Sequence, residues 1–200
     1  MMVFWDQRLV ILSTPKTGST ALESALESRA ALISRRPPEL KHTPAYRYRR
    51  FLAPYLEKTA NGPFMVVAVM REPIDWLGSW YRFRQRKTLP PARHDTSVMS
   101  FDAFVEGYIA KPRPGFADVG SQARFLSDKA GKVVDRIFAY ENQPEFLEFL
   151  EQRLAMTIRL DRENVSPAMA LSLSPDLERR LRFACADDFA LYELVCQGRA

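Results

Sequence analysis

Two short stretches of the chain are apolar at every position, and each is followed by a polar turn. They span residues 9–12 and 64–70. Uninterrupted apolar runs of this length are typical of strands that lie buried on both faces of a parallel sheet. Residues 19–26, and the segment that begins at Pro73, then repeat apolar positions with helical spacing. The pattern predicts two successive units of strand, loop and helix.

Further elements continue this alternation along the chain. We expect helices over residues 43–58, 101–109, 120–127, 144–154 and 175–196, and strands over residues 133–140 and, more weakly, 156–160. Polar residues and prolines at 87–100 predict a mobile loop. Alternating strands and helices predict an α/β fold in which one parallel sheet carries helices on both faces.

The last predicted helix carries an acidic residue on its apolar face. Asp188 shares that face with a set of apolar residues: Leu177, Leu181, Ala184, Leu191 and Val195. Because a buried carboxylate needs hydrogen-bond partners, we expect Asp188 to bind a neighbouring loop. Cys185 and Cys196 lie in the same helix, about 16 Å apart along its axis, which predicts free thiols.

Length and composition fit one folded unit. The 200 residues, 46% hydrophobic and 26% charged, suffice for one substantial core, so we expect a single domain over residues 1–200. No run of about 18 apolar residues occurs, which argues against a membrane span. Polar and charged residues precede the first apolar run, the reverse of the order in a secretory signal. We therefore expect a cytoplasmic protein, with a net charge of +5.

A candidate anion site lies between the first strand and its helix. This loop contains a lysine, a glycine and three hydroxyl groups, in the order Lys16, Thr17, Gly18, Ser19 and Thr20. Free N–H groups at a helix start, the helix dipole and a lysine ammonium all favour a phosphate-like group. The lysine precedes the glycine, so the Walker A order of nucleotide triphosphatases is absent. An ordinary capped helix remains an alternative for this segment.

The second apolar run ends in a cation. Arg71 follows residues 64–70, and Ser79 follows Arg71 by eight positions. Ligands of parallel sheets bind at the carboxyl ends of the strands, where Arg71 is expected. The sequence therefore places cationic side chains at the ends of two predicted strands.

These two motifs resemble those of the sulfotransferases that use 3′-phosphoadenosine 5′-phosphosulfate (PAPS). Residues 16–20 are similar to the loop that binds the 5′-phosphosulfate in that family, and Arg71 with Ser79 is similar to its 3′-phosphate motif. The version with Pro73 and Tyr81 looks like that of the Golgi-type carbohydrate sulfotransferases and their bacterial relatives. Weaker similarity is found at residues 120–126, 140–141, 164–166 and 188–192.

The resemblance implies a fold, a reaction and a set of roles. The fold would be a P-loop NTPase-like parallel sheet flanked by helices, and the reaction a sulfuryl transfer from PAPS to a hydroxyl or amine, with no metal required. Lys16 would neutralise charge on the leaving phosphate, with Thr17, Gly18, Ser19, Thr20, Arg71 and Ser79 binding the donor. A histidine or glutamate commonly acts as base in this family. His42 lies between the two motifs and fits that role, with Glu23 or Glu39 as alternatives.

Other functions stay open beside this one. Basic and aromatic residues interleave at 46–51 and 80–87, which could bind nucleic acid or hold an anionic acceptor such as an acidic glycan. We favour two amphipathic helices with solvated arginines, so nucleic acid is not the expected partner. The rival functions are a non-catalytic module that binds adenosine 3′,5′-bisphosphate or nucleic acid, and an atypical P-loop nucleotide kinase.

The sequence shows no metal-ligand cluster and fits several classes of acceptor. Two histidines and two distant cysteines give no ligand cluster with zinc spacing. Carbohydrate, lipid and small-molecule acceptors all fit, because acceptor pockets are built from variable loops, here expected at residues 35–41 and 84–100. The oligomeric state is not predicted.

Overall fold

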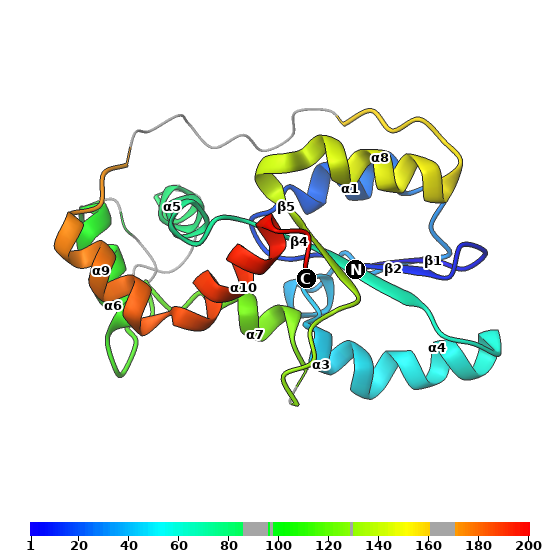
Figure 1. Ribbon diagram of the computed structural model, residues 1–200, viewed down its shortest axis with the longest axis horizontal. Coiled ribbons are helices and arrows are strands. Elements are labelled where there is room, and N and C mark those ends of the chain that lie inside the picture. Colours follow the sequence, from blue (N-terminus) through cyan, green and yellow to red (C-terminus); the bar gives the residue numbers. More distant parts are fainter. Residues whose placement is uncertain (86–95, 97, 129, 161–170) are drawn as a thin grey trace.

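The computed structural model describes residues 1–85, 96, 98–128, 130–160 and 171–200 (Figure 1). The loop predicted at 87–100 lies mostly outside these residues. The sequence similarity at 164–166 lies outside them entirely.

A five-stranded sheet in the order β3-β1-β2-β4-β5 forms the centre of the molecule. The strands are β1 (Met2–Phe4), β2 (Leu9–Leu12), β3 (Leu32–Ile33), β4 (Met65–Met70) and β5 (Arg136–Ala139). β2, β4 and β5 run parallel, whereas β1 pairs antiparallel with both β2 and β3. The α/β class is confirmed, but the prediction of a wholly parallel sheet is wrong.

The mixed character of the sheet follows from a tight turn near the start of the chain. Only four residues separate β1 from β2, and Arg8 adopts a left-handed conformation there with φ 51°. A connection of this length can join only antiparallel neighbours, because a parallel crossover needs about a dozen residues.

The two fully apolar runs form two of the interior strands of the sheet. Residues 9–12 and 64–70 are confirmed as β2 and β4, and the strand expected at 133–140 contains β5. The strand expected at 156–160 is wrong. Ile158 donates its backbone N–H to the side chain of Glu151, at 2.7 Å, instead of to a neighbouring strand.

Helices cover both faces of the sheet (Figure 1). One face carries α1 (Ser19–Leu26) and α8 (Gln143–Leu154), whose buried side chains pack against Leu9 and Ile11. The opposite face carries α3 (Ala45–Arg47), α4 (Ala53–Ala60), α7 (Gln122–Leu126) and α10 (Ala186–Cys196). There Val10 and Leu12 contribute to the core. Successive residues of β2 therefore point to opposite faces, as strand geometry requires.

A second helical cluster lies beside the sheet. It consists of α5 (Pro73–Arg84), α6 (Phe101–Ile109) and α9 (Pro175–Ala184), at the left of Figure 1. Trp76 and Leu77 of α5 pack there with Phe104 and Leu181. The helix that follows β4 thus joins this cluster to the sheet.

The helix predicted over 43–58 is interrupted. Residues 45–60 are helical throughout, but Tyr48–Leu52 form a π-helical turn between α3 and α4. The N–H of Ala53 donates to the carbonyl of Tyr48, five residues back. This turn directly precedes Pro54, which has no N–H to continue a regular helix and would crowd the preceding turn. A short helix, α2 (Pro38–Lys41), precedes this segment.

The last helix is not continuous, contrary to the prediction. Cys185, at φ −121° and ψ 33°, separates α9 from α10. Leu177 and Leu181 pack in the cluster beside the sheet, whereas Leu191 and Val195 pack on the sheet itself. The break lets the two halves of the apolar stripe reach different cores.

Two further expectations about this region are confirmed. Asp188 binds the start of α7, where it accepts from Ser121 Oγ at 2.9 Å and from the Ala123 N–H at 3.0 Å. Both cysteines are free. In the described part of the chain, no helix is long and apolar enough to cross a membrane.

Candidate functional site

The loop after β2 presents unpaired N–H groups at the start of α1. Lys16 and Gly18 have left-handed conformations, with φ 67° and 73°, and Gly18 is the residue from which α1 begins. In the described part of the chain, no side chain caps this helix start. Within the described residues, the N–H groups of Ser19, Thr20 and Ala21 have no acceptor. Such N–H groups, together with the helix dipole, favour an anion.

Donors from the second unit hold this loop in place. Trp76 Nε1 donates to the carbonyl of Pro15 at 3.0 Å, and Arg71 donates to the carbonyl of Lys16 at 3.2 Å. Inside the loop, Thr17 Oγ1 donates to the carbonyl of Thr14 at 2.9 Å. Because two of its carbonyls are fixed from α5 and β4, the loop is preformed.

Arg71 lies at the end of β4, as predicted, and it carries a partner that the sequence analysis missed. Its Nε and Nη2 atoms both lie 2.6 Å from Asp75 Oδ2, and its guanidinium stacks on Tyr140 at 4.4 Å from the ring centroid. A phosphate on Arg71 must therefore share or replace the Asp75 carboxylate. The spacing of four residues was the available signal.

The side chain of Lys16 lies against α5. Its ammonium is 4.0 Å from the ring centroid of Phe83 and 5.5 Å from that of Trp80. Two buried polar atoms lack a partner among the described residues near this loop: the indole N–H of Trp80 and the hydroxyl of Thr14. Since buried polar groups are rarely left unpaired, these atoms fit a site that holds a polar ligand.

Ser79 lies on α5, two turns after Arg71, and is only 6% exposed. In the part of the chain that the structure describes, no hydrogen bond joins Ser79 to Arg71. The structure thus brings Lys16, Arg71 and the loop together, and it leaves Ser79 inside the helix packing.

His42 contacts the base of the same loop. Its Nδ1 atom lies 2.6 Å from the carbonyl oxygen of Ser13. Because a carbonyl oxygen can only accept, Nδ1 carries the proton, and the neutral ring keeps a free lone pair on Nε2. Burial lowers the pKa of His42 below its ordinary value, against the opposing effect of the Ser13 hydrogen bond. A neutral imidazole in this tautomer is suited to accept a proton.

A buried ion pair stands beside His42. The carboxylate of Glu23 is held by Lys41 Nζ at 2.9 Å and by Ser13 Oγ at 3.0 Å, and Glu23 is only 3% exposed. Lys41 Nζ also donates to Thr20 Oγ1 at 3.0 Å. Glu23 is therefore less suited than His42 to act as a base, and Glu39 is exposed on α2. The signal for the buried role of Glu23 was its place between Leu22 and Leu26.

A pocket opens beside the loop. Its volume is about 480 Å³, which includes open solvent at its mouth, and its wall includes Thr17, Gly18 and Ser19. Tyr140 and Gln143 form part of the opposite wall, and the remaining lining is mainly apolar. Apolar walls with a few polar groups are typical of sites for small organic ligands.

The arrangement places free N–H groups at a helix start close to a neutral imidazole. Among the described residues, no group of three or more histidine, cysteine, aspartate or glutamate side chains could hold a metal ion. Comparisons with protein-family models, with curated proteins and with solved structures find no match for the chain.

Proposed function

We propose that the chain transfers a sulfuryl group from PAPS to an acceptor hydroxyl. One observation carries the proposal: His42 is hydrogen-bonded to Ser13, at the base of the loop whose free N–H groups and Lys16 favour a phosphate-like group. A candidate base and a candidate donor site thus share one strand end. The resemblance of residues 16–20 and of Arg71 to the sulfotransferase motifs supports PAPS as the donor.

On the donor side, the residues present fit a phosphosulfate. The N–H groups of the first turn of α1, together with Lys16, would hold the 5′ end, and Arg71 would hold the 3′-phosphate. Bound PAPS supplies a sulfuryl group attached to a phosphate that can leave. The cations and N–H groups stabilise the negative charge that grows on that phosphate oxygen.

On the acceptor side, His42 acts as the general base. Its Nε2 takes the proton of the acceptor hydroxyl while the oxygen of that hydroxyl bonds to sulfur. The bond between sulfur and the phosphate oxygen breaks, and adenosine 3′,5′-bisphosphate leaves. A carbohydrate is one candidate acceptor, and an amine could react in the same way. In this proposal the parallel strands β2, β4 and β5 correspond to a P-loop NTPase-like sheet.

Thermal unfolding with added ligand tests the donor site. Adenosine 3′,5′-bisphosphate at about 100 times its dissociation constant should stabilise the protein by about 2.7 kcal/mol. Adenosine 5′-monophosphate should shift the melting temperature far less, because it lacks the 3′-phosphate. A shift of equal size with ATP and Mg²⁺ would favour the nucleotide kinase instead, and no shift with any nucleotide would refute the donor site.

Turnover then separates an enzyme from a silent binding module. Incubation with PAPS and a panel of hydroxyl acceptors should release adenosine 3′,5′-bisphosphate. Selective binding of the bisphosphate without release over a broad panel would support the non-catalytic module.

A further inference from the structure

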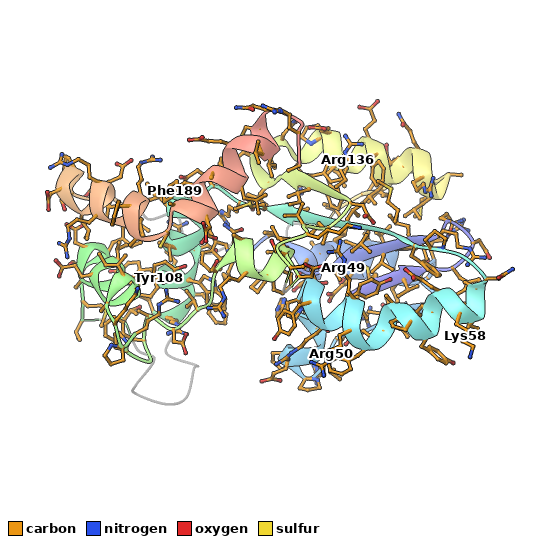
Figure 2. The ribbon with its side chains drawn as sticks, turned by 60° about the horizontal axis from the view of Figure 1, so that its bottom comes forward. Arg49, Arg50, Lys58, Tyr108, Arg136 and Phe189 are labelled. Atoms are coloured by element: carbon orange, nitrogen blue, oxygen red, sulfur yellow. The ribbon has the colours of Figure 1, made fainter. Side chains whose placement is uncertain are left out.

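The helical segment from α3 to α4 has an outer face that combines cations with exposed aromatic rings. Its residues, which we call the α4 face, are Arg47, Arg50, Phe51, Tyr55 and Lys58. All five are exposed, so they share the solvent side of the helical segment over residues 45–60. Figure 2 shows Arg50 and Lys58 along the outer edge of this segment.

The two rings of the α4 face are unusually exposed. Phe51 is 63% exposed and Tyr55 is 71% exposed, on successive turns of the helix. The guanidinium of Arg50 lies 5.2 Å from the centroid of the Phe51 ring. Two large aromatic rings that are both exposed to water and bordered by cations are typical of a surface that binds a partner.

The cations of the α4 face are not neutralised locally. Within the described residues, Arg47, Arg50 and Lys58 have no carboxylate partner. The single acidic residue of 45–60 is Glu57, which is half-buried. Burial raises the pKa of the Tyr48 hydroxyl, and the nearby charge of Glu57 raises it further. The face therefore has a net charge of three positive units.

A second helix of the same protein provides the contrast. On α9, Phe183 is 89% exposed and is also surrounded by arginines. There, however, Arg179 pairs with Asp176 at 2.9 Å, and Arg180 pairs with Glu106 at 3.5 Å. The α9 surface is balanced in charge, so the unbalanced charge of the α4 face is a particular feature and not a general property of the surface.

We propose that the α4 face docks on an anionic lipid surface, with Phe51 and Tyr55 in the headgroup boundary and the cations on the lipid phosphates. A helix with apolar rings beside basic residues suits such an interface. The pocket described above is lined by other residues, and a convex helix provides no channel for the backbone of a single-stranded nucleic acid. A second copy is also disfavoured, because a two-fold contact would bring like charges together.

This inference does not rest on the proposed sulfotransferase activity. It is tested by co-sedimentation of the chain with vesicles of phosphatidylcholine alone and with vesicles that also contain phosphatidylglycerol. We expect binding only to the anionic vesicles, and release as the salt concentration rises. Because each basic residue near such a surface contributes about a factor of five, the triple variant Arg47→Gln, Arg50→Gln, Lys58→Gln should partition about 100-fold less.

The matched control is the triple variant Arg179→Gln, Arg180→Gln, Phe183→Ser on α9, which should bind as the unchanged chain does. The double variant Phe51→Ser, Tyr55→Ser should lose binding although its charge is unaltered. Apart from Arg179 and Arg180 of the control, none of the substituted side chains takes part in an ion pair with a described residue. Circular dichroism verifies that each variant is folded. In addition, Phe51→Trp should show a larger blue shift of its emission with anionic vesicles than the unchanged chain, whose three tryptophans provide the baseline. This difference reports entry of position 51 into the boundary.

Several results would overturn the proposal. Equal binding of the chain to both kinds of vesicle would contradict the proposal. An equal loss of vesicle binding in the α9 control would show that the α4 face is not responsible for the binding. Binding of a single-stranded oligonucleotide that depends on the α4 face, without vesicle binding, would assign the face to nucleic acid. A dimer in sedimentation equilibrium that the α4-face substitutions dissociate would assign it to a second copy.

Discussion

At the scale of single residues, the candidate site depends on contacts made to Ser13. Its carbonyl fixes the tautomer of His42, and its hydroxyl donates to Glu23. Both contacts are made by Ser13, which directly precedes the loop between β2 and α1 (residues 14–18, called the anion loop below). The base and the ion pair are therefore held by the same backbone that positions the loop.

Replacement of His42 separates binding from transfer. His42→Ala should keep the affinity for adenosine 3′,5′-bisphosphate and reduce turnover at least about 100-fold, because only the proton acceptor is lost. Isothermal titration and a turnover assay measure the two effects. If both fall equally, His42 is part of the donor site and not the base.

The pH dependence of turnover follows from the same residue. Burial holds the pKa of His42 below its ordinary value of 6.5. The neutral, proton-accepting form therefore persists as the pH falls through 6.5, and turnover should decline only at lower pH. A profile that already falls above pH 6.5 would contradict this assignment.

Asp75 is expected to weaken phosphate binding by competing for Arg71. Asp75→Asn should raise the affinity for adenosine 3′,5′-bisphosphate about two- to fivefold, the range of a partly exposed ion pair. Asp176→Asn, which removes the acidic partner of Arg179 on α9, should leave the affinity unchanged. A weaker affinity in Asp75→Asn would mean that Asp75 orients Arg71 for the ligand.

Sequence reasoning reached some of these residues and missed others for a physical reason. Lys16 and Arg71 follow apolar strands, so their place at the sheet edge could be predicted. The pairing of Glu23 with Lys41 could not, because it joins segments 18 residues apart through the path of the chain between them. Asp75 could have been found from its helical spacing to Arg71.

At the scale of elements, the loop that starts α1 needs a residue that tolerates a left-handed backbone. Gly18 has φ 73°, and a Cβ there would meet only the Tyr140 ring, at 3.8 Å. Gly18→Ala should therefore destabilise the protein by about 1 kcal/mol through backbone strain and not through a clash. Chemical denaturation measures this.

Gly62 provides the comparison, since a Cβ there meets nothing within 4 Å and its backbone is not left-handed. Gly62→Ala should be neutral or slightly stabilising. An equal loss of stability in both variants would show that the conformation of Gly18 has no special cost.

Asp188 links α10 to the start of α7. Asp188→Ala should cost about 1–3 kcal/mol, because it removes the acceptor for Ser121 and Ala123. Asp188→Asn should cost less near neutral pH, since the amide oxygen can still accept from the Ala123 N–H. A loss in Asp188→Asn as large as that in Asp188→Ala would mean that the charge itself is required.

The stability of the unchanged chain and that of Asp188→Asn should also differ in their dependence on pH. Burial raises the pKa of Asp188 in the folded state, despite the hydrogen bonds from Ala123 and Ser121. The folded protein thus takes up this proton at higher pH than the unfolded chain does. The stability that this proton uptake contributes is complete below the pKa of Asp188 in the unfolded chain. It is lost as the pH rises through the pKa in the folded state. The unchanged chain should gain stability relative to Asp188→Asn on acidification.

The accuracy of the predicted strands follows their length. β2 and β4 lie inside the sheet and are apolar throughout, so the sequence identifies them. β1 and β3 have three and two residues, too few for a recognisable period. The break at Cys185 could not be predicted from the sequence for a different reason. The apolar residues on both sides of it keep helical spacing, and the break follows only from their packing in two different cores.

At the scale of the whole molecule, the helical cluster of α5, α6 and α9 is coupled to the anion loop. Trp76 belongs to that cluster and donates to the carbonyl of Pro15. Trp76→Phe should reduce the affinity for adenosine 3′,5′-bisphosphate about fivefold, the value of one hydrogen bond. Trp5→Phe, at a position packed on Phe64, should not change it. Equal effects of both would exclude a coupling through Trp76.

The architecture as a whole was only partly readable from the sequence. Alternation of strands and helices predicted the α/β class, which depends on local patterns. The antiparallel β1 depends on a short turn, and the cluster beside the sheet depends on contacts between α5, α6 and α9 that are distant in the chain.

The contact of Lys16 with Trp80 and Phe83 makes the site visible to spectroscopy. An ammonium near an indole changes the fluorescence of that ring, and an anion in the loop would draw the ammonium towards itself. Emission from Trp80 would then change on binding, without any label. The protein thus contains its own optical probe. The part of a fluorescence titration that is lost in Trp80→Phe would follow occupancy of the loop, because the chain has two other tryptophans.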